Sequence, residues 1–513
     1  MRRFLLLSIL WSILPRIAAS QSVRVPALWE GLIPGPHQVG FKSFWRRDWS
    51  RGWTATVDAK GRQTGVVARP VRINLWYPAV ASRIPNMRFS DYIGSAKTPG
   101  FEKVEDIVKR ADLGQAGEKG LLNIFSSKAA VESLFTTRVA AHRDAPLASG
   151  RFPVIVYALG QGDYTQEDIP LCEYLASRGY IVVSVAQLGT SERRDVLFIH
   201  DKPSYDAEVQ DLGFALATGL REMPSADSNR VGAIGMSMGG VYSLLLALRT
   251  PAIRVVVGLD PSYVSTMASF AYRYWEAPEF DAAAFRGSIL TLYRQDSTPR
   301  TRVVDSLYYA DRTFFRLPFS VHTDFTGYPA YARHVPFAAQ DSFALAHRSP
   351  EKAAESYVNW VNYLTCYIDG ALAGNASQID CVGPPGAERE IVPPSTGLTE
   401  EELYTLMRQY GLPSALSALS DRTAHHDAWH LRRPTMRRIV NELGYAGRPL
   451  ESAQYAELLA TAFGDAESYE QLGDAWADAG DAARARIAYG HAVEMDPTRV
   501  SARTKLDGLT KKD

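Results

Sequence analysis

Residues 231–244 read VGAIGMSMGGVYSL and place Ser237 among glycines, at a point where the hydrophobic pattern changes. RVGAI ahead of the serine is typical of a strand, whereas GGVYSLLLALRT behind it has the spacing of an amphipathic helix. A tight turn from strand to helix requires small residues two positions before and two positions after the serine, and Gly235 and Gly239 meet that requirement. Such a turn makes a hydroxyl protrude where a general base can take its proton, so we predict that Ser237 is a nucleophile.

The chain around this turn alternates between strands and helices. Short β-branched runs recur from about residue 70, and the stretches between them carry apolar residues at helical spacing. The expected strands are VRINLWYP, RFPVIVYALG, IVVSVAQLG, NRVGAIGMS, IRVVVGLDP and GSILTLYRQD. Because parallel strands need crossover helices, the pattern predicts an α/β domain with a mostly parallel, doubly wound sheet over residues 21–382.

Two segments interrupt this rhythm. Residues 86–150 are polar and have mostly helical spacing, so we expect a largely helical insertion there. Insertions on sheet scaffolds often cap an active site, although a peripheral decoration is the alternative. Residues 383–398, GPPGAEREIVPPSTGL, are rich in proline and glycine and are predicted to be a linker.

Residues 399–513 have helical period throughout, which predicts a separate all-α domain. A stretch that starts at Ala466 matches the pattern of a tetratricopeptide repeat of about 34 residues. The matching residues are Leu472, Gly473, Trp476, Gly480, Ala485, Tyr489, Ala492 and Pro497. The small residues let two helices approach closely and the aromatic residues fill the gap, so the pattern concerns packing first. These helical repeats are also a candidate surface for a protein partner.

A nucleophilic serine needs a carboxylate and a histidine that follow it in the chain. The histidines between Ser237 and the linker are His322, His334 and His347. His322 directly follows TFFRLPFSV, which resembles a last strand, and is the predicted base. Asp260 in VVVGLDPSY and Asp296 in LTLYRQDST both end strands, and topology alone favours Asp296 because it ends the later strand.

The reaction of such a serine also needs two backbone donors for the developing oxyanion. One comes from the residue after the nucleophile, which is Met238. The other is expected in the loop after PVIVYA, where Gly160 and Gly162 flank Gln161. We therefore predict that the amides of Gln161 and Met238 form an oxyanion hole.

Several segments together resemble secreted α/β-hydrolases of the platelet-activating-factor acetylhydrolase and dienelactone hydrolase-like group. The resemblance covers roughly residues 30–370 and rests on GPHQVGFKSF, RPVRINLWYPA, GMSMGG, GLDPSY and SVHTDF, in that order. It implies an α/β-hydrolase fold and favours Asp260 over Asp296 as the acid. This chain departs from the family in the oxyanion loop, where Leu159 and Gly160 stand in place of a histidine-glycine pair.

The resemblance implies a serine hydrolase that cleaves a carboxylic ester through an acyl-enzyme, with a small-molecule or lipid-like substrate and no cofactor. Two other hypotheses stay open. The same triad would also support acyl transfer or peptide cleavage, because other nucleophiles can intercept an acyl-enzyme. Alternatively, the helical repeats would make the protein an interaction scaffold with an inactive hydrolase-like domain. The acyl chain length of the substrate is not indicated by the sequence.

The first 20 residues predict a secretory signal peptide, because Arg2 and Arg3 precede an apolar run that is too short to span a bilayer. A secreted or periplasmic protein follows from this. An oxidising compartment would let Cys366 pair with Cys381, whereas Cys172 is expected to be a buried apolar residue.

The composition excludes other classes of function. Acidic and basic residues balance at 56 each and form no basic block, so a nucleic acid partner is not expected. Three cysteines make no metal cluster. His425, His426 and His430 in AHHDAWH are interpreted as packing or surface residues of a helix, so no metal is predicted.

Overall fold

The protein is described here from a computed structural model. The structure describes residues 25–57, 62–113, 128–162, 164–190, 201–264, 273–277, 280–297, 302–318, 320–332, 334, 349–374, 380–395, 397–421 and 430–510. The predicted signal peptide lies outside the described residues.

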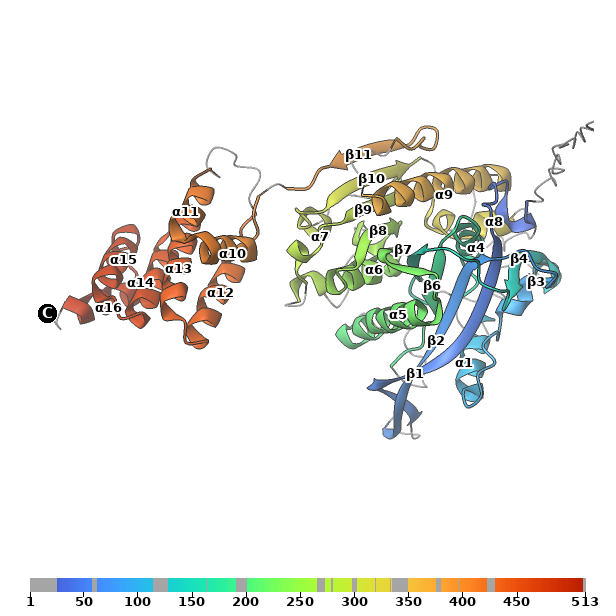
Figure 1. Ribbon diagram of the computed structural model, residues 1–513, viewed down its shortest axis with the longest axis horizontal. Coiled ribbons are helices and arrows are strands. Elements are labelled where there is room, and N and C mark those ends of the chain that lie inside the picture. The colour runs from blue at the N-terminus through green and yellow to red at the C-terminus, as the bar shows by residue number, and fades with distance from the viewer. Residues whose placement is uncertain are drawn as a thin grey trace, which may run out of the picture.

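A single sheet runs through the larger domain (Figure 1). It has 11 strands in the order β11-β10-β9-β8-β7-β5-β6-β2-β1-β4-β3. The strands are β1 Gln38–Val57, β2 Gln63–Ala79, β3 Asn86–Arg88, β4 Arg138–Arg143, β5 Phe152–Ala158, β6 Ile181–Val185, β7 Ala226–Met236, β8 Ile253–Leu259, β9 Ser288–Arg294, β10 Asp311–Leu317 and β11 Glu388–Val392. From β6 to β10 along the sheet, every neighbouring pair is parallel. β2 is antiparallel to both β1 and β6. This topology confirms the predicted α/β-hydrolase fold class.

Helices that follow the strands in sequence cover both faces of the sheet (Figure 1). The larger ones are α4 Ile169–Ser177, α5 Lys202–Glu222, α6 Met238–Arg249 and α9 Pro350–Leu372. Successive residues of a strand point to opposite faces, so Ile155 packs with α4 and α9 while Val156 packs with α5 and α6. Strands covered in this way must be apolar on both sides, which explains continuous runs such as VVVGL in β8.

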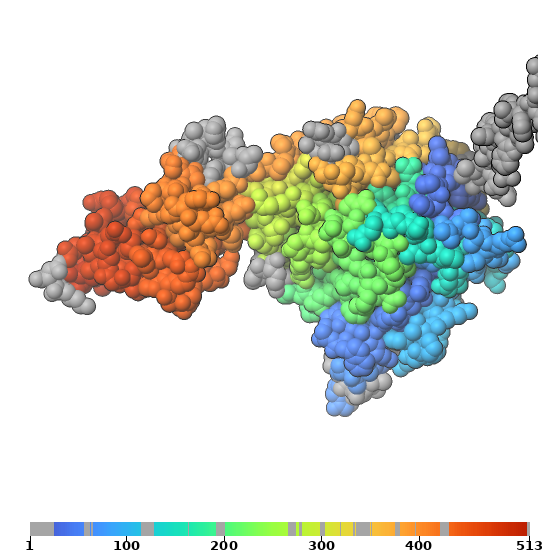
Figure 2. All heavy atoms as spheres, in the orientation of Figure 1, coloured from blue at the N-terminus to red at the C-terminus, as the bar shows by residue number. Residues whose placement is uncertain are grey.

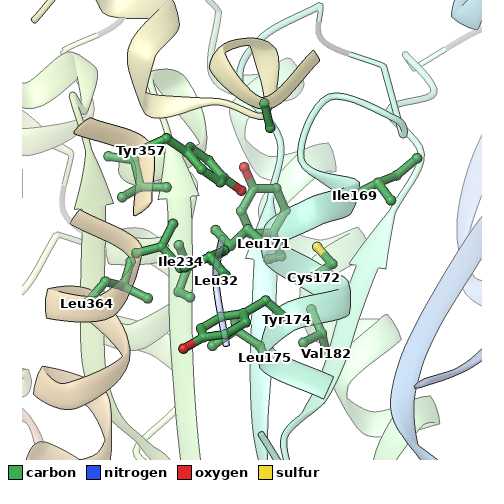
Figure 3. Packing of buried hydrophobic residues seen from close by; sticks show 14 of the residues in the cluster. Leu32, Ile169, Leu171, Cys172, Tyr174, Leu175, Val182, Ile234, Tyr357 and Leu364 are labelled. Atoms are coloured by element: carbon green, nitrogen blue, oxygen red, sulfur yellow. The ribbon is translucent and has the colours of Figure 1, made fainter. Parts of the chain in front are cut away.

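Figure 3 shows part of the layer formed by α4 and α9. Leu171 and Leu175 of α4, Tyr357 and Leu364 of α9, and Ile234 of β7 belong to one buried cluster. All five side chains are fully buried. Burial of one such side chain stabilises the folded protein by about 1.5–3 kcal/mol. The layer therefore holds in place the central strands, whose carboxyl ends carry the site.

The insertion at residues 86–150 contains strands as well as helices. The helices in its described part are η2 Phe89–Tyr92, α1 Glu102–Asp112 and α3 Lys128–Thr136. β3 and β4 lie on either side of them in sequence, and β4 pairs in parallel with β1. The prediction of a largely helical insertion misses these two strands, which are short and extend the edge of the sheet.

The predicted linker at residues 383–398 is wrong in its central part. Residues Glu388–Val392 form β11, which pairs antiparallel with β10 and completes the sheet. The segment reads as polar because β11 is an outermost strand whose side chains are mostly exposed. The chain therefore leaves the larger domain only after Val392.

The predicted all-α domain is confirmed over the described part of residues 399–510. Its helices are α10 Glu400–Tyr410, α11 Leu412–Asp421, α12 Arg433–Tyr445, α13 Pro449–Phe463, α14 Ala466–Asp478, α15 Ala482–Met495 and α16 Val500–Thr510. α14 begins at Ala466, where the repeat was placed, and Gly473 lies so close to the Tyr489 ring that a Cβ would clash with it. The assignment to the tetratricopeptide family stays a prediction.

The two domains touch. Figure 2 shows the helical domain, in orange and red, against the yellow-green part of the larger domain. His430 stacks on Tyr308 with ring centroids 3.6 Å apart, and Arg432 pairs with Asp281 at 3.0 Å. A further ion pair joins Arg286 to Glu402 at 2.8 Å.

Cys366 of α9 and Cys381 form a disulfide, while Cys172 is a buried free thiol. The bond ties the end of α9 to the segment that leads into β11. Among the described residues, no helix is both long and apolar enough to cross a membrane.

Candidate active site

Ser237 stands at the turn between β7 and α6 in a backbone conformation that is rare for a residue with a side chain. Its φ and ψ are 53° and −120°. Ser237 N donates to Leu259 O at 3.0 Å, and Ser237 O accepts from Ser262 N at 2.9 Å and Gly240 N at 3.1 Å. Strain of this kind costs about 1–3 kcal/mol and persists only where neighbouring structure imposes it, as these bonds do.

The glycines around Ser237 are required by close backbone contacts. A Cβ on Gly235 would overlap the carbonyl of Gly239, and a Cβ on Gly239 would overlap the carbonyls of Ala158 and Leu159. The obstacles are backbone atoms, which cannot rotate away. The turn can therefore form against β5 only with glycine at both positions, which is the reason for the spacing seen in the sequence.

Asp260 and His322 meet beside this turn. Asp260 directly follows β8, with a φ of 38°, and its amide donates to Leu292 O at 2.7 Å. His322 begins the short helix η7 His322–Phe325 that follows β10. His322 Nδ1 lies 2.6 Å from Asp260 Oδ2. The Asp260 side chain is 3% exposed and the His322 side chain 32%, so the pair has a buried acid and an accessible imidazole.

The other candidate acid, Asp296, occupies a different environment. Its side chain is 76% exposed and lies 2.8 Å from Arg294 Nε. Asp260 instead accepts hydrogen bonds from Arg294 N at 3.3 Å and from Ser297 Oγ at 3.5 Å, and the Arg294 guanidinium is 3.3 Å from its carboxylate. The structure thus places Asp260, and not Asp296, against His322.

Ser237 belongs to the same cluster. Its backbone is bonded to Leu259 and Ser262, which flank the acid on either side. Its Oγ lies 3.4 Å from Ser262 Oγ, and within the described ranges no hydrogen bond joins it to His322.

The remaining histidines that follow Ser237 in the larger domain do not compete with His322. His334 Nε2 lies 2.9 Å from Ala27 O and 3.2 Å from Glu30 Oε1, so this ring is bound to the beginning of the described chain. His347 lies outside the described residues.

The two predicted oxyanion donors come from neighbouring strands. Met238 is the first residue of α6, so its amide lies in the first turn, where helix N–H groups lack intrahelical partners. Gln161 follows β5, which pairs in parallel with β7. Both amides therefore lie at the carboxyl ends of these two strands. Gln187, which the sequence reasoning did not identify, holds the Gln161 loop through its side-chain amide.

The loop after β5 is bonded to the loop that carries His322. Tyr164 donates from its hydroxyl to that of Tyr328 at 2.7 Å, and Gly327 N donates to Glu167 O at 3.0 Å. Tyr331 adds a hydrogen bond from its hydroxyl to Gln166 O at 2.7 Å. These contacts hold the segment after β5 against the segment that follows His322.

A buried carboxyl group supports this junction. Asp168 precedes α4, and burial raises its pKa well above the usual range for an aspartate. The Tyr157 hydroxyl is bonded to it.

The insertion also contacts the segment between β5 and α4. Gln166 Nε2 donates to Asp112 Oδ2, in the last residue of α1, at 3.3 Å. α1 therefore borders the segment that follows the predicted oxyanion loop. Whether the insertion caps the site stays a prediction.

Metal ligands do not gather in the described part of the chain. No group of three or more His, Cys, Asp or Glu side chains there is arranged to hold an ion. His430 is stacked on Tyr308, and His425 and His426 lie outside the described residues.

No protein-family model matches this sequence, and no curated protein matches it either. Among solved structures, the chain is similar to a ferulic acid esterase from Streptomyces cinnamoneus, with 20% sequence identity and a TM-score of 0.49. The match covers 70% of this chain and 98% of the esterase. The chemistry of the site therefore rests on the geometry of its own residues.

Proposed function

We propose that this protein is a serine hydrolase of carboxylic esters, with Ser237 as nucleophile, His322 as base and Asp260 as acid. The observation that carries the proposal is the 2.6 Å contact between His322 Nδ1 and Asp260 Oδ2, made next to a serine at a strained turn. A carboxylate at Nδ1 holds the imidazole in the tautomer whose Nε2 can accept a proton.

The reaction follows from these positions. Ser237 Oγ attacks the ester carbonyl carbon while His322 Nε2 takes the hydroxyl proton, and the amides of Gln161 and Met238 hold the negative oxygen that forms. Collapse of this intermediate breaks the bond to the alcohol, which leaves with the proton from His322. Water then attacks the acyl-serine in the same way, releases the acid and restores Ser237.

The substrate that we propose is a small-molecule or lipid-like ester. The predicted signal peptide and the Cys366–Cys381 disulfide support a secreted or periplasmic location, because disulfides persist in oxidising compartments. The helical domain is proposed to bind a protein partner, and nothing in the reaction depends on it.

The test is labelling by a fluorophosphonate probe, which reacts with an activated serine. Mass spectrometry of the adduct should locate the label on Ser237 in the parent protein and find none in Ser237→Ala. Ser262→Ala is the matched control, because Ser262 is the neighbouring hydroxyl, 3.4 Å away, and should leave labelling at Ser237 in place. An unlabelled parent protein would favour the scaffold hypothesis and contradict the proposal.

Turnover assays then separate the possible acyl acceptors. A panel of esters of increasing acyl length, matched amides, and esters with added alcohol should show hydrolysis of esters above that of amides. Faster release of product as a new ester in the presence of alcohol would instead identify an acyltransferase.

A further inference from the structure

Gln187 lies just beyond the carboxyl end of β6, on the same side of the sheet as Gln161. β6 pairs with β5 in parallel, so the chain leaves both strands on that side. β5 leads into residues 159–162 and β6 leads into Gln187. Because Gln187 is 9% exposed, its carboxamide must find hydrogen-bond partners inside the protein.

The carboxamide of Gln187 makes three hydrogen bonds to the backbone of this loop. Its Nε2 donates to Gly160 O at 2.9 Å and to Leu159 O at 3.2 Å. Its Oε1 accepts from Gly162 N at 2.8 Å. One side chain therefore binds the peptide groups on both sides of Gln161.

These bonds fix the direction of the Gln161 amide. The Gly160 carbonyl and the Gln161 N–H belong to one peptide group, and in a trans peptide they point in opposite directions. Since the Gly160 oxygen points at Gln187, the Gln161 N–H points away from Gln187. The Gly162 N–H is bound by Gln187 and is not available to a substrate.

The backbone of this loop does not hold that direction by itself. Gly162 has a φ of 77° and Gly160 has no side chain, so the peptide groups beside Gln161 can rotate at little steric cost. A rotated group would present the Gly160 carbonyl, an acceptor, where an oxyanion requires a donor. The side chain of Gln187 opposes this rotation because it donates to the carbonyl and accepts from the amide.

We propose that Gln187 is a positioning residue for the oxyanion hole, which acts by holding the Gln161 amide in its donating direction. This inference rests on the function proposed above. Gln187 itself does not touch the reacting atoms.

The kinetic test compares Gln187→Glu and Gln187→Leu with the parent protein. Glutamate places a negative charge against two carbonyl oxygens, and leucine removes both halves of the contact. We expect kcat to fall by roughly 100-fold with KM little changed, since loss of one oxyanion donor costs about 10²–10³ in kcat. The rate at which a fluorophosphonate labels Ser237 should fall with it. In Gln187→Leu, which adds no charge, the acid limb of the kcat/KM profile should stay where it is because His322 and Asp260 are untouched.

Asn74→Leu is the matched control. Asn74 is a fully buried carboxamide in β2 that accepts a hydrogen bond from Ser43 Oγ at 2.7 Å. Its loss should lower Tm, as the loss of any buried amide contact does, while kcat and labelling stay near those of the parent. A fall in kcat as large as that of the Gln187 variants would mean that general loosening explains both, and would overturn the proposal.

Hydrogen–deuterium exchange of the peptide that contains residues 159–162 tests the contact between Gln187 and this loop without a substrate. Exchange at Gly162 should quicken in Gln187→Leu, which removes the acceptor of its N–H, and not in Asn74→Leu. Unchanged exchange overturns the proposal, as does unchanged kcat despite faster exchange. A parent protein that is not labelled at Ser237 contradicts the proposed function and the catalytic half of this inference together, while exchange still decides whether Gln187 holds the loop.

Discussion

His322 Nδ1 lies 2.6 Å from Asp260 Oδ2, although 62 residues separate the two in the chain. The acid is almost wholly buried, and its amide is bonded to the neighbouring strand β9 through Leu292. The carboxylate is therefore fixed while the imidazole beside it stays accessible. This is the arrangement in which a carboxylate can stabilise an imidazolium without taking its proton.

Asp260→Asn should lower kcat by roughly 10⁴-fold, because an amide at this position favours the wrong imidazole tautomer. The check is kcat on whichever ester the parent protein turns over. Asp296→Asn is the matched control, since Asp296 is mostly exposed and bonded to Arg294. Equal losses in the two variants would contradict the assignment of Asp260.

Gly239→Ala should destabilise the larger domain by about 1–3 kcal/mol and abolish activity, because its Cβ would overlap the carbonyls of Ala158 and Leu159. Gly213→Ala in α5 is the control: its Cβ would meet Leu246 at an ordinary 3.5 Å and gain roughly 0.5–1 kcal/mol of helix propensity. Chemical denaturation of both variants decides between them. A Gly239→Ala protein as stable as the control would show that the turn tolerates a side chain.

Removal of the disulfide should destabilise the protein by about 3 kcal/mol, the value expected for a loop of roughly 15 residues. The measurement is Tm of a Cys366→Ser, Cys381→Ser double variant beside the parent, each with and without reductant. Reductant should lower Tm of the parent and leave the double variant unchanged. A parent insensitive to reductant would contradict the bond.

The helical domain should lose stability in acid through Glu470. Burial opposes its ionisation, but hydrogen bonds from Ser501, Lys505 and Arg499 outweigh burial and lower the pKa to about 2 from a usual 4.5. A lowered pKa in the folded state means that this contribution is complete above pH 4.5 and is lost as pH falls toward 2.

Glu470→Gln should therefore lower Tm at pH 7 and flatten its dependence on pH below 4.5. The control is Glu494→Gln, an exposed glutamate on α15, which should keep the dependence of the parent. Circular dichroism melts across this pH range provide the comparison. Parallel curves for parent and Glu470→Gln would show that the contacts of Glu470 do not set acid stability.

The sequence indicates the turn at Ser237 because backbone clashes impose glycine at fixed distances from this serine, and that requirement is visible as spacing. The acid is harder to identify. Asp260 and Asp296 both follow strands, and only the three-dimensional arrangement separates the buried one beside His322 from the exposed one.

Other features leave a weaker trace in the sequence. β11 is a short charged strand between prolines, so its sequence pattern resembles a linker. Only its pairing with β10 in the structure identifies it as a strand. Gln187 is a single polar residue after a strand, and nothing in its neighbours indicates which backbone atoms it binds. Contacts made between distant segments by one side chain have no periodicity that could predict them.

β11 also determines which strand lies at this edge of the sheet. Without it, β10 would end the sheet with a row of unpaired backbone groups, which is a template for aggregation. β11 covers that edge and presents Glu388, Arg389 and Glu390 outward, all of them exposed. A chain shortened at residue 382 would leave the outer backbone groups of β10 unpaired and able to bind strands of other chains. An independent version of this domain therefore has to extend past Val392.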